Sequence, residues 1–242
     1  GIATVELGWP FAAALAAGAV AGGAVGLAFA TILLRTSGIL LGTVTIALGQ
    51  SLALIARNTP SLGGSQGYSG IPLSTNIWWA GSCAAIALAV ALGLRRSRIG
   101  LAMLATERDE TVARSVGISV RTIRRWGFTV GGALAGLGGV LLAHNNGIIE
   151  PKDLSFAAEP LFFVFLMIGG VSTPWGAFVG ALGVWWFQEL LRFGDGGTFL
   201  FLDREDRYWI LGLILVVVVL LRPGGLLVRR HVTRGRAGSV DM

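Results

Sequence analysis

The chain has 242 residues, of which 54% are hydrophobic and only 13% are charged, and its formal net charge is +6. A soluble domain carries about 25% charged residues, so this composition excludes an ordinary soluble protein and indicates an all-α integral membrane protein. The basic residues lie at the ends of apolar segments, which is typical of membrane topology and not of a nucleic-acid-binding face. We therefore expect a lipid bilayer, and no nucleic acid, around this chain.

Three apolar segments precede the most charged part of the chain. They are residues 9–34, 38–56 and 77–94. Each is long enough to cross about 30 Å of hydrocarbon as a helix. The first contains the pairs Gly18/Gly22 and Gly22/Gly26, a spacing that lets two helix backbones approach closely. We expect this first helix to pack inside a bundle.

The second segment differs because it carries hydroxyl and amide side chains at bilayer depth, namely Thr43, Thr45, Gln50 and Ser51, with Gly49 beside them. Such groups are costly in a membrane unless they face protein or a water-filled path. Hydrogen bonding between helices explains each of them singly, whereas their clustering favours a translocation pathway. The glycine-rich loop 58–76 that follows lacks the lysine of a phosphate-binding loop, which argues against a nucleotide site.

The stretch 95–125 holds eight of the 19 Lys and Arg residues and separates two apolar blocks. Within it, residues 106–116 are predicted to form a short helix with one charged face. Glu110 and Arg114 have the favourable i,i+4 spacing, and Gly117 is suited to the left-handed conformation that ends many helices. Two interpretations stay open: a solvated loop, or a docking helix for a soluble partner.

Residues 126–143 are predicted to cross the membrane again, with Gly127/Gly131 and Gly132/Gly136 as close-packing pairs. His144, at the end of this segment, is interpreted as an interfacial residue, because no second His or carboxylate has metal-ligand spacing. Cys83 lies in an apolar block, so we expect a small buried side chain and no disulfide.

Two short apolar runs, 160–171 and 175–191, are interrupted by Gly169-Gly170 and Pro174. They predict either a tight pair of helices or one broken helix, with a backbone that is buried in protein or lines a cavity. Residues 208–221 are predicted to be the last span, and residues 222–242 a basic tail.

The charge distribution predicts the orientation of about seven transmembrane or broken helices in one domain, residues 1–242. If the spans alternate with the loop 95–125 in the cytoplasm, 14 basic residues face inward and five face outward. This split obeys the positive-inside rule. It predicts an N-terminus outside and a C-terminus in the cytoplasm.

Several phrases, taken in chain order, resemble those of a known family. They are TIALGQ at 45–50, GGSQGYSGIP at 63–72, SRIG, ATERDE and ARSVGI within 97–118, IGGVSTPWG at 168–176, and LRPGGL at 221–226. Together they resemble the branched-chain amino-acid permease family, the membrane subunits of ATP-driven bacterial importers. That family usually begins with further helices, so we expect the N-terminal part of the protein to be missing from this chain.

The resemblance implies a permease subunit in the bacterial plasma (inner) membrane for branched-chain amino acids or related small polar solutes. It implies a second permease subunit, two cytoplasmic ATPase subunits and an extracytoplasmic substrate-binding protein as partners. The predicted helix 106–116 would be the coupling helix seated in the ATPase, with contacts from Thr106, Glu107, Arg108, Asp109, Glu110, Arg114 and Gly117. The predicted pathway residues are Thr43, Thr45, Gly49, Gln50, Gly169 and Gly170.

The chain contains no Walker motif, so ATP and Mg²⁺ are expected on the partner subunits, and we expect neither catalysis nor a cofactor or metal in this chain. The alternative is a secondary transporter or channel that works without ATP. It is less favoured because no predicted span carries a mid-bilayer Asp, Glu or Lys suited to ion coupling. A cofactor-bearing membrane enzyme lacks the paired ligands that it would need.

Overall fold

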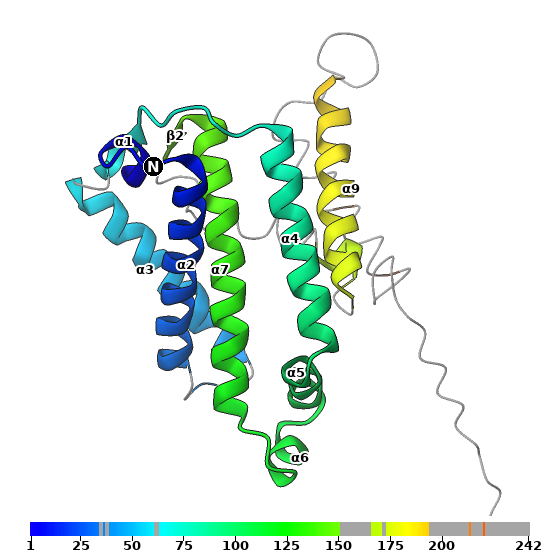
Figure 1. The fold of residues 1–242 in the computed structure, drawn as a ribbon. Coiled ribbons are helices and arrows are strands. Elements are labelled where there is room, and N and C mark those ends of the chain that lie inside the picture. Colours follow the sequence, from blue (N-terminus) through cyan, green and yellow to red (C-terminus); the bar gives the residue numbers. More distant parts are fainter. Residues whose placement is uncertain are drawn as a thin grey trace, which may run out of the picture. The chain divides into compact units, whose positions relative to one another are not determined.

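The computed structural model describes residues 1–33, 36, 39–60, 63–150, 166–170, 173–193, 213 and 220 (Figure 1). The contacts divide the chain into two compact units, Gly1–Glu159 and Pro160–Met242, and each is described by itself below. The single permease domain over residues 1–242 stays a prediction.

The first unit is built from four long helices that are apolar enough to cross a membrane. They are α2 (Phe11–Leu33), α3 (Ile39–Asn58), α4 (Ile77–Arg96) and α7 (Val120–Asn146). The predicted all-α membrane architecture is confirmed for these segments. Helix α7 begins well before residue 126, so the last part of the predicted charged loop is already helical. The predicted spans 160–171 and 208–221 lie outside the described residues, apart from residues 166–170, 213 and 220.

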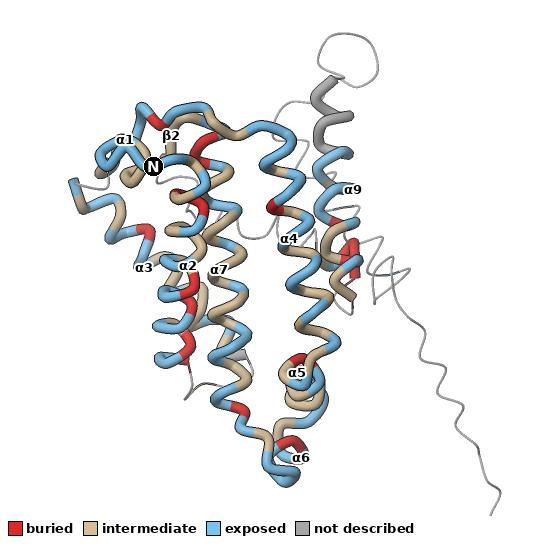
Figure 2. The backbone as a smooth tube through the Cα atoms, viewed as in Figure 1, coloured by how far each residue is buried: buried red, intermediate tan, exposed pale blue. Residues whose placement is uncertain are grey.

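Helices α2 and α7 lie side by side with their backbones in direct contact (Figure 1). A Cβ atom added to Gly22 would collide with the carbonyl oxygen of Gly132, and one added to Gly132 would collide with that of Gly22. A Cβ atom added to Gly136 would collide with the carbonyl oxygen of Gly18, and one added to Gly18 would collide with the Val140 side chain and come within 3.1 Å of the Gly136 carbonyl oxygen. The predicted pairs Gly18/Gly22 and Gly132/Gly136 therefore form the contact, as small-xxx-small spacing favours. Buried residues recur along α2 (Figure 2).

The predicted pair Gly127/Gly131 does not take part in this contact. Among the described residues, a Cβ atom on Gly131 would meet nothing within 4 Å, and one on Gly127 would meet only the end of the Met103 side chain. Helical periodicity explains the difference, because Gly131 lies one position, or about 100°, away from Gly132 around α7. Spacing alone identified the right helix, but it did not separate the contacting stripe from its neighbour.

Short elements close one end of the first unit. Strand β1 (Tyr68–Ser69) pairs antiparallel with β2 (Ile148–Ile149), and the turn before it contains η2 (Gly64–Gln66). Gly67 has φ +80° and abuts the carbonyl oxygen of Ile149, so this position accepts glycine only. The predicted glycine-rich loop 58–76 is thus joined by a small strand pair to the segment that follows α7.

His144, near the end of α7, is fully buried within the first unit. Its Nδ1 lies 2.9 Å from the carbonyl oxygen of Val140, and its Nε2 lies 3.1 Å from Oγ1 of Thr4 in α1 (Ile2–Val5). The Phe11 ring packs edge-on against it at a centroid distance of 5.0 Å. The segment before α2 covers the imidazole and shields it from solvent, whereas its depth in the membrane stays a prediction. Cys83 on α4 is buried, as predicted.

The chain turns sharply where α4 meets α5 (Arg98–Arg108). Ser97 is extended, and its hydroxyl oxygen accepts a hydrogen bond from the Gly100 N–H at 3.1 Å, which caps α5. A Cβ atom on Gly100 would collide with the carbonyl oxygen of Leu94, so the two helices touch at the corner. Figure 1 shows α5 end-on beneath α4, so α5 runs across the direction of the long helices.

In the second unit, residues 166–169 are helical and are followed by the break at Gly170, which has φ +105°. Helix α9 (Pro174–Phe193) begins after it. A Cβ atom on Gly169 would collide with the carbonyl oxygen of Gly176 and come within 2.9 Å of the Gly180 Cα. Since Gly169 lies close to both Gly176 and Gly180, the chain doubles back. Only residues 166–170 of the first predicted run are described, so the choice between a tight pair of helices and one broken helix stays a prediction.

Candidate coupling site

The predicted helix 106–116 is two helices in the structure, which corrects the sequence prediction. Thr106, Glu107 and Arg108 end α5, and α6 (Glu110–Ser115) begins after Asp109. Asp109 is extended, with φ −156° and ψ 110°, and its carboxylate accepts hydrogen bonds from the N–H groups of Thr111 at 2.8 Å and Val112 at 3.0 Å. Aspartate stabilises helix starts by this cap and is a weak former inside a helix, which explains the break.

Gly117 ends α6 as predicted. Its φ is +82°, its N–H donates to the Arg114 carbonyl at 3.0 Å, and the Ile118 N–H donates to the Ala113 carbonyl at 3.0 Å. This pair of hydrogen bonds is a Schellman motif, which favours glycine at its left-handed position. Helix α6 is therefore a short segment with a defined cap at each end.

Glu110 binds two arginines. Its Oε1 lies 2.6 Å from Nη2 of Arg114, which confirms the predicted i,i+4 pair, and its Oε2 lies 3.1 Å from Nη2 of Arg124. The Arg114 side chain is 65% exposed, so that pair contributes little. The side chains of Arg124 and Glu110 are only 19% and 29% exposed, so their pair is better shielded from water and salt.

Arg124 also reaches a third element. Its Nη1 donates to the carbonyl oxygen of Thr36 at 2.8 Å, just beyond the end of α2. One guanidinium on α7 thus connects α6 with the residue that follows α2. A planar fork with several donors makes such a double contact possible, whereas lysine offers only a point charge.

Sequence reasoning did not single out Arg124, although it identified Glu110. The two residues are 14 positions apart, and the turn after α6 brings them together. No helical periodicity reports such a contact. The sequence offers only a weak signal for this pair: Arg124 is one of three arginines at 121–125, and the preceding segment 106–116 contains only three acids that could bind them.

A groove of about 530 Å³ lies beside this ion pair, between α5 and the first turns of α7. Thr106, Glu107 and Arg124 line its polar side, and Met103 and Phe128 line its apolar side. The Thr106 hydroxyl donates to the Ala102 carbonyl of its own helix at 2.8 Å. Arg108 is exposed and has no ion pair among the described residues. The predicted coupling residues therefore surround one region but do not form one helix.

The predicted pathway residues divide between the two units. On α3, the Thr43 hydroxyl donates to the Leu40 carbonyl at 3.1 Å, and the Thr45 hydroxyl donates to the Leu41 carbonyl at 2.7 Å. Gly49 and Gln50 are half-buried on the same helix. These hydroxyls bond to their own helix, which lowers the cost of placing them in a membrane.

Gly169 and Gly170 belong to the second unit, where they form the tight turn described above. The role of all six residues in a pathway stays a prediction. Within the described ranges, no group of three or more His, Cys, Asp or Glu residues has the arrangement of a metal site.

Comparison with known proteins identifies the family. The model of the family described as "Branched-chain amino acid transport system / permease component" matches residues 1–220. The chain belongs to this family. Its members are membrane-spanning permease components, in agreement with the four apolar helices of the first unit.

Several curated permeases of the family are similar to the chain. The high-affinity branched-chain amino acid transport system permease protein LivM of Escherichia coli (strain K12) is 30% identical over 134 residues, which cover 55% of this chain and 29% of LivM. LivH of the same strain is 29% identical over 147 residues, covering 61% of this chain and 45% of LivH. BraD of Pseudomonas aeruginosa is 33% identical over 144 residues, covering 59% of this chain and 44% of BraD.

The matched region therefore spans less than half of each relative's length. No solved structure matches the chain.

Proposed function

We propose that the chain is the membrane-spanning, non-catalytic subunit of an ATP-driven importer of branched-chain amino acids or related small polar solutes. Its membership of the permease family and the printed function of LivM, LivH and BraD support the class of solute. The energy source, the direction of transport and the substrate are parts of the proposal.

The proposed assembly contains a second, similar permease, two cytoplasmic ATPase subunits that bind ATP and Mg²⁺, and an extracytoplasmic substrate-binding protein. The chain lies in the bacterial inner membrane with the turn between α5 and α6 in the cytoplasm. Arginines at the ends of α4 and α5 and in the first turns of α7 support this orientation, because positive charge is retained on the cytoplasmic side.

The observation that carries the proposed mechanism is the double contact of Arg124 with Glu110 and the Thr36 carbonyl. Helix α6 is short, capped at both ends and mostly exposed, so it presents a defined surface to an ATPase subunit. When ATP closure displaces α6, the Glu110–Arg124 ion pair transmits that displacement to α7 and to the end of α2. Access then alternates between the two sides of the membrane.

The change in access requires that the two states of the permease differ in their affinity for the ATPase subunits. ATP shifts the permease toward one state only if the closed ATPase pair binds that state better than the other. Because Arg124 contacts both Glu110 and the Thr36 carbonyl, the ion pair extends the energetic effect of ATPase binding from α6 to α7 and the end of α2. In the same proposal, the residues that line or support the path taken by the solute are Thr43, Thr45, Gly49, Gln50, Gly169 and Gly170.

The test is uptake of radiolabelled leucine by proteoliposomes that contain the full-length chain with its partner permease, ATPases and binding protein. Glu110→Gln is expected to reduce ATP-dependent uptake at least about tenfold while the ATPases still hydrolyse ATP. Arg121→Gln, which removes an exposed arginine that is not among the predicted coupling residues, is the control and is expected to retain uptake within about twofold.

Full uptake by a stable Glu110→Gln assembly would contradict the coupling role. Uptake by the chain alone, without nucleotide, would favour the secondary transporter. Uptake that requires ATP but is not competed by any branched-chain amino acid would contradict the proposed substrate class.

A further inference from the structure

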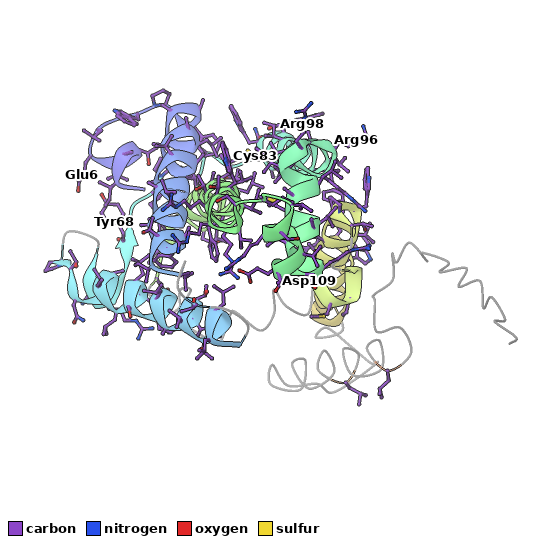
Figure 3. All side chains as sticks on the ribbon, turned by 90° about the horizontal axis from the view of Figure 1, so that it is seen from below. Glu6, Tyr68, Cys83, Arg96, Arg98 and Asp109 are labelled. Atoms are coloured by element: carbon purple, nitrogen blue, oxygen red, sulfur yellow. The ribbon has the colours of Figure 1, made fainter. Side chains whose placement is uncertain are left out.

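We propose that the corner between α4 and α5 is a binding site for an anionic phospholipid headgroup. The corner is defined here as Arg95, Arg96, Arg98 and the adjoining Leu101. It lies at the opposite end of α5 from Asp109 (Figure 3). An 11-residue helix is about 16 Å long, so the corner is separate from the candidate coupling site.

The first step is the charge. Within the described residues, six arginines have no carboxylate within 4.0 Å: Arg95, Arg96, Arg98, Arg108, Arg121 and Arg125. Three of them gather at the corner within four positions. The sequence contains no Asp or Glu between Glu6 and Glu107, so no acid from this long stretch can neutralise them. Among the described residues, the corner is therefore a concentrated positive charge to which no carboxylate is bound.

The second step is the position of this charge relative to the bilayer. Helix α4 is an apolar span of 20 residues that ends with Arg95 and Arg96. A helix of this length measures about 30 Å, the thickness of the hydrocarbon layer, so its last residues lie at headgroup depth. This holds for either orientation of the chain, and the inference therefore does not depend on the proposed function.

The third step is the geometry of the corner. Ser97 caps α5, and Gly100 abuts the carbonyl of Leu94, so Arg98 is held close to the end of α4. Figure 3 shows Arg96 and Arg98 as neighbours on the outer side of this corner. Guanidinium groups bind phosphate oxygens through paired hydrogen bonds, so three arginines on one backbone corner suit a phosphodiester.

The fourth step distinguishes a lipid from a free anion. Leu101 is 60% exposed and lies one turn after Arg98, and Leu104 is exposed beyond it. A helix that runs across the span direction with arginine at its start and exposed leucines beside it is typical of a helix at a membrane interface. Arginines for the headgroup and leucines for the acyl chains together favour an anionic phospholipid.

The test is native mass spectrometry of the full-length chain, purified in mild detergent with the subunits that co-purify and supplied with phosphatidylglycerol or phosphatidylcholine. The native assembly is expected to retain phosphatidylglycerol in preference to phosphatidylcholine. Each basic residue near an anionic surface contributes about a fivefold preference, so Arg95→Gln/Arg96→Gln/Arg98→Gln is expected to weaken retention at least about tenfold. The matched control, Arg108→Gln/Arg121→Gln/Arg125→Gln, is expected to retain the lipid within about twofold.

Equal retention by the corner variant, or an equal loss in the control, would overturn the proposal. Because a triple variant can fail to assemble, a second measurement uses the native corner with a photoreactive benzoylphenylalanine in place of Leu101. Illumination in bilayers that contain phosphatidylglycerol is expected to give a lipid adduct. An adduct only with an ATPase or permease subunit would show that protein covers this corner and would overturn the lipid site.

Discussion

Glu110 on α6 and Arg124 on α7 lie 3.1 Å apart, and the second terminal nitrogen of Arg124 is 2.8 Å from the Thr36 carbonyl oxygen. The connection joins three parts of the first unit through a single side chain. In the proposed function, this connection passes a displacement of α6 to α7 and to the end of α2.

Arg124→Gln is expected to lower the free energy of unfolding by about 1–3 kcal/mol, because it removes a charge-assisted hydrogen bond to Glu110 and another to a backbone carbonyl. Thermal unfolding of the assembly in detergent measures this change. A double-mutant cycle with Glu110→Gln is expected to show coupling between the two positions, whereas the cycle of Glu110→Gln with Arg114→Gln is expected to show less than about 1 kcal/mol. Equal coupling in the two cycles would contradict the assignment of Arg124 as the main partner.

Gly22→Ala and Gly132→Ala are each expected to destabilise the protein by about 1–3 kcal/mol, because the new methyl group meets a backbone carbonyl that cannot move aside. The thermal unfolding temperature in detergent reports the loss. Gly131→Ala is the control on the same helix, since a Cβ atom there meets nothing within 4 Å among the described residues. If Gly131→Ala destabilises as much as Gly132→Ala, the contact between α2 and α7 is not the cause.

Sequence patterns predicted the long helices and the glycine contact because both depend on features that repeat along the chain. Apolar length gives the spans, and small residues every four positions give a close approach. The phrase around Gly169 and Gly170 likewise predicted a break. Apolar length, glycine spacing and the break at Gly169 and Gly170 are all properties of short segments, so they can be predicted from a single sequence.

The remaining features depend on contacts between distant residues or on a choice between local structures. Asp109 fitted the charged face of a helix as well as it fits a cap, so one helix was predicted where two occur. Arg124 and His144 acquire their partners through folding across long sequence separations. His144 is buried because the short helix α1 packs over its imidazole, and the sequence around His144 does not report this contact.

Asp109→Ala is expected to destabilise α6 by about 0.5–2 kcal/mol, because the N–H groups of Thr111 and Val112 lose their acceptor. Hydrogen exchange of these two amides measures the effect and is expected to accelerate. Asp109→Asn keeps an oxygen acceptor and is expected to retain most of the protection. Unchanged exchange in Asp109→Ala would show that the cap does not hold α6.

Gly117→Ala is expected to cost about 1–2 kcal/mol, because an alanine there must adopt the left-handed conformation that the Schellman motif requires. The change is expected to speed hydrogen exchange in α6 without altering α7. Gly138→Ala is the comparison, since Gly138 is helical and a Cβ atom there meets no described atom within 4 Å. That variant is expected to be neutral or stabilising by up to about 1 kcal/mol. Equal losses in the two variants would argue against strain at Gly117.

The glycine contact between α2 and α7 determines which parts of the first unit can move independently. Where two backbones touch, no side chain is available to change rotamer and absorb a displacement, so the two helices behave as one body. Helices α4 and α5 share a similar contact at Gly100 and form a second body. Motion within this unit is therefore expected at the turns around Asp109 and Ser119 and not within the long helices. A pair of spectroscopic labels on α2 and α7 would keep a constant separation through the transport cycle, whereas a pair on α4 and α7 would report the change.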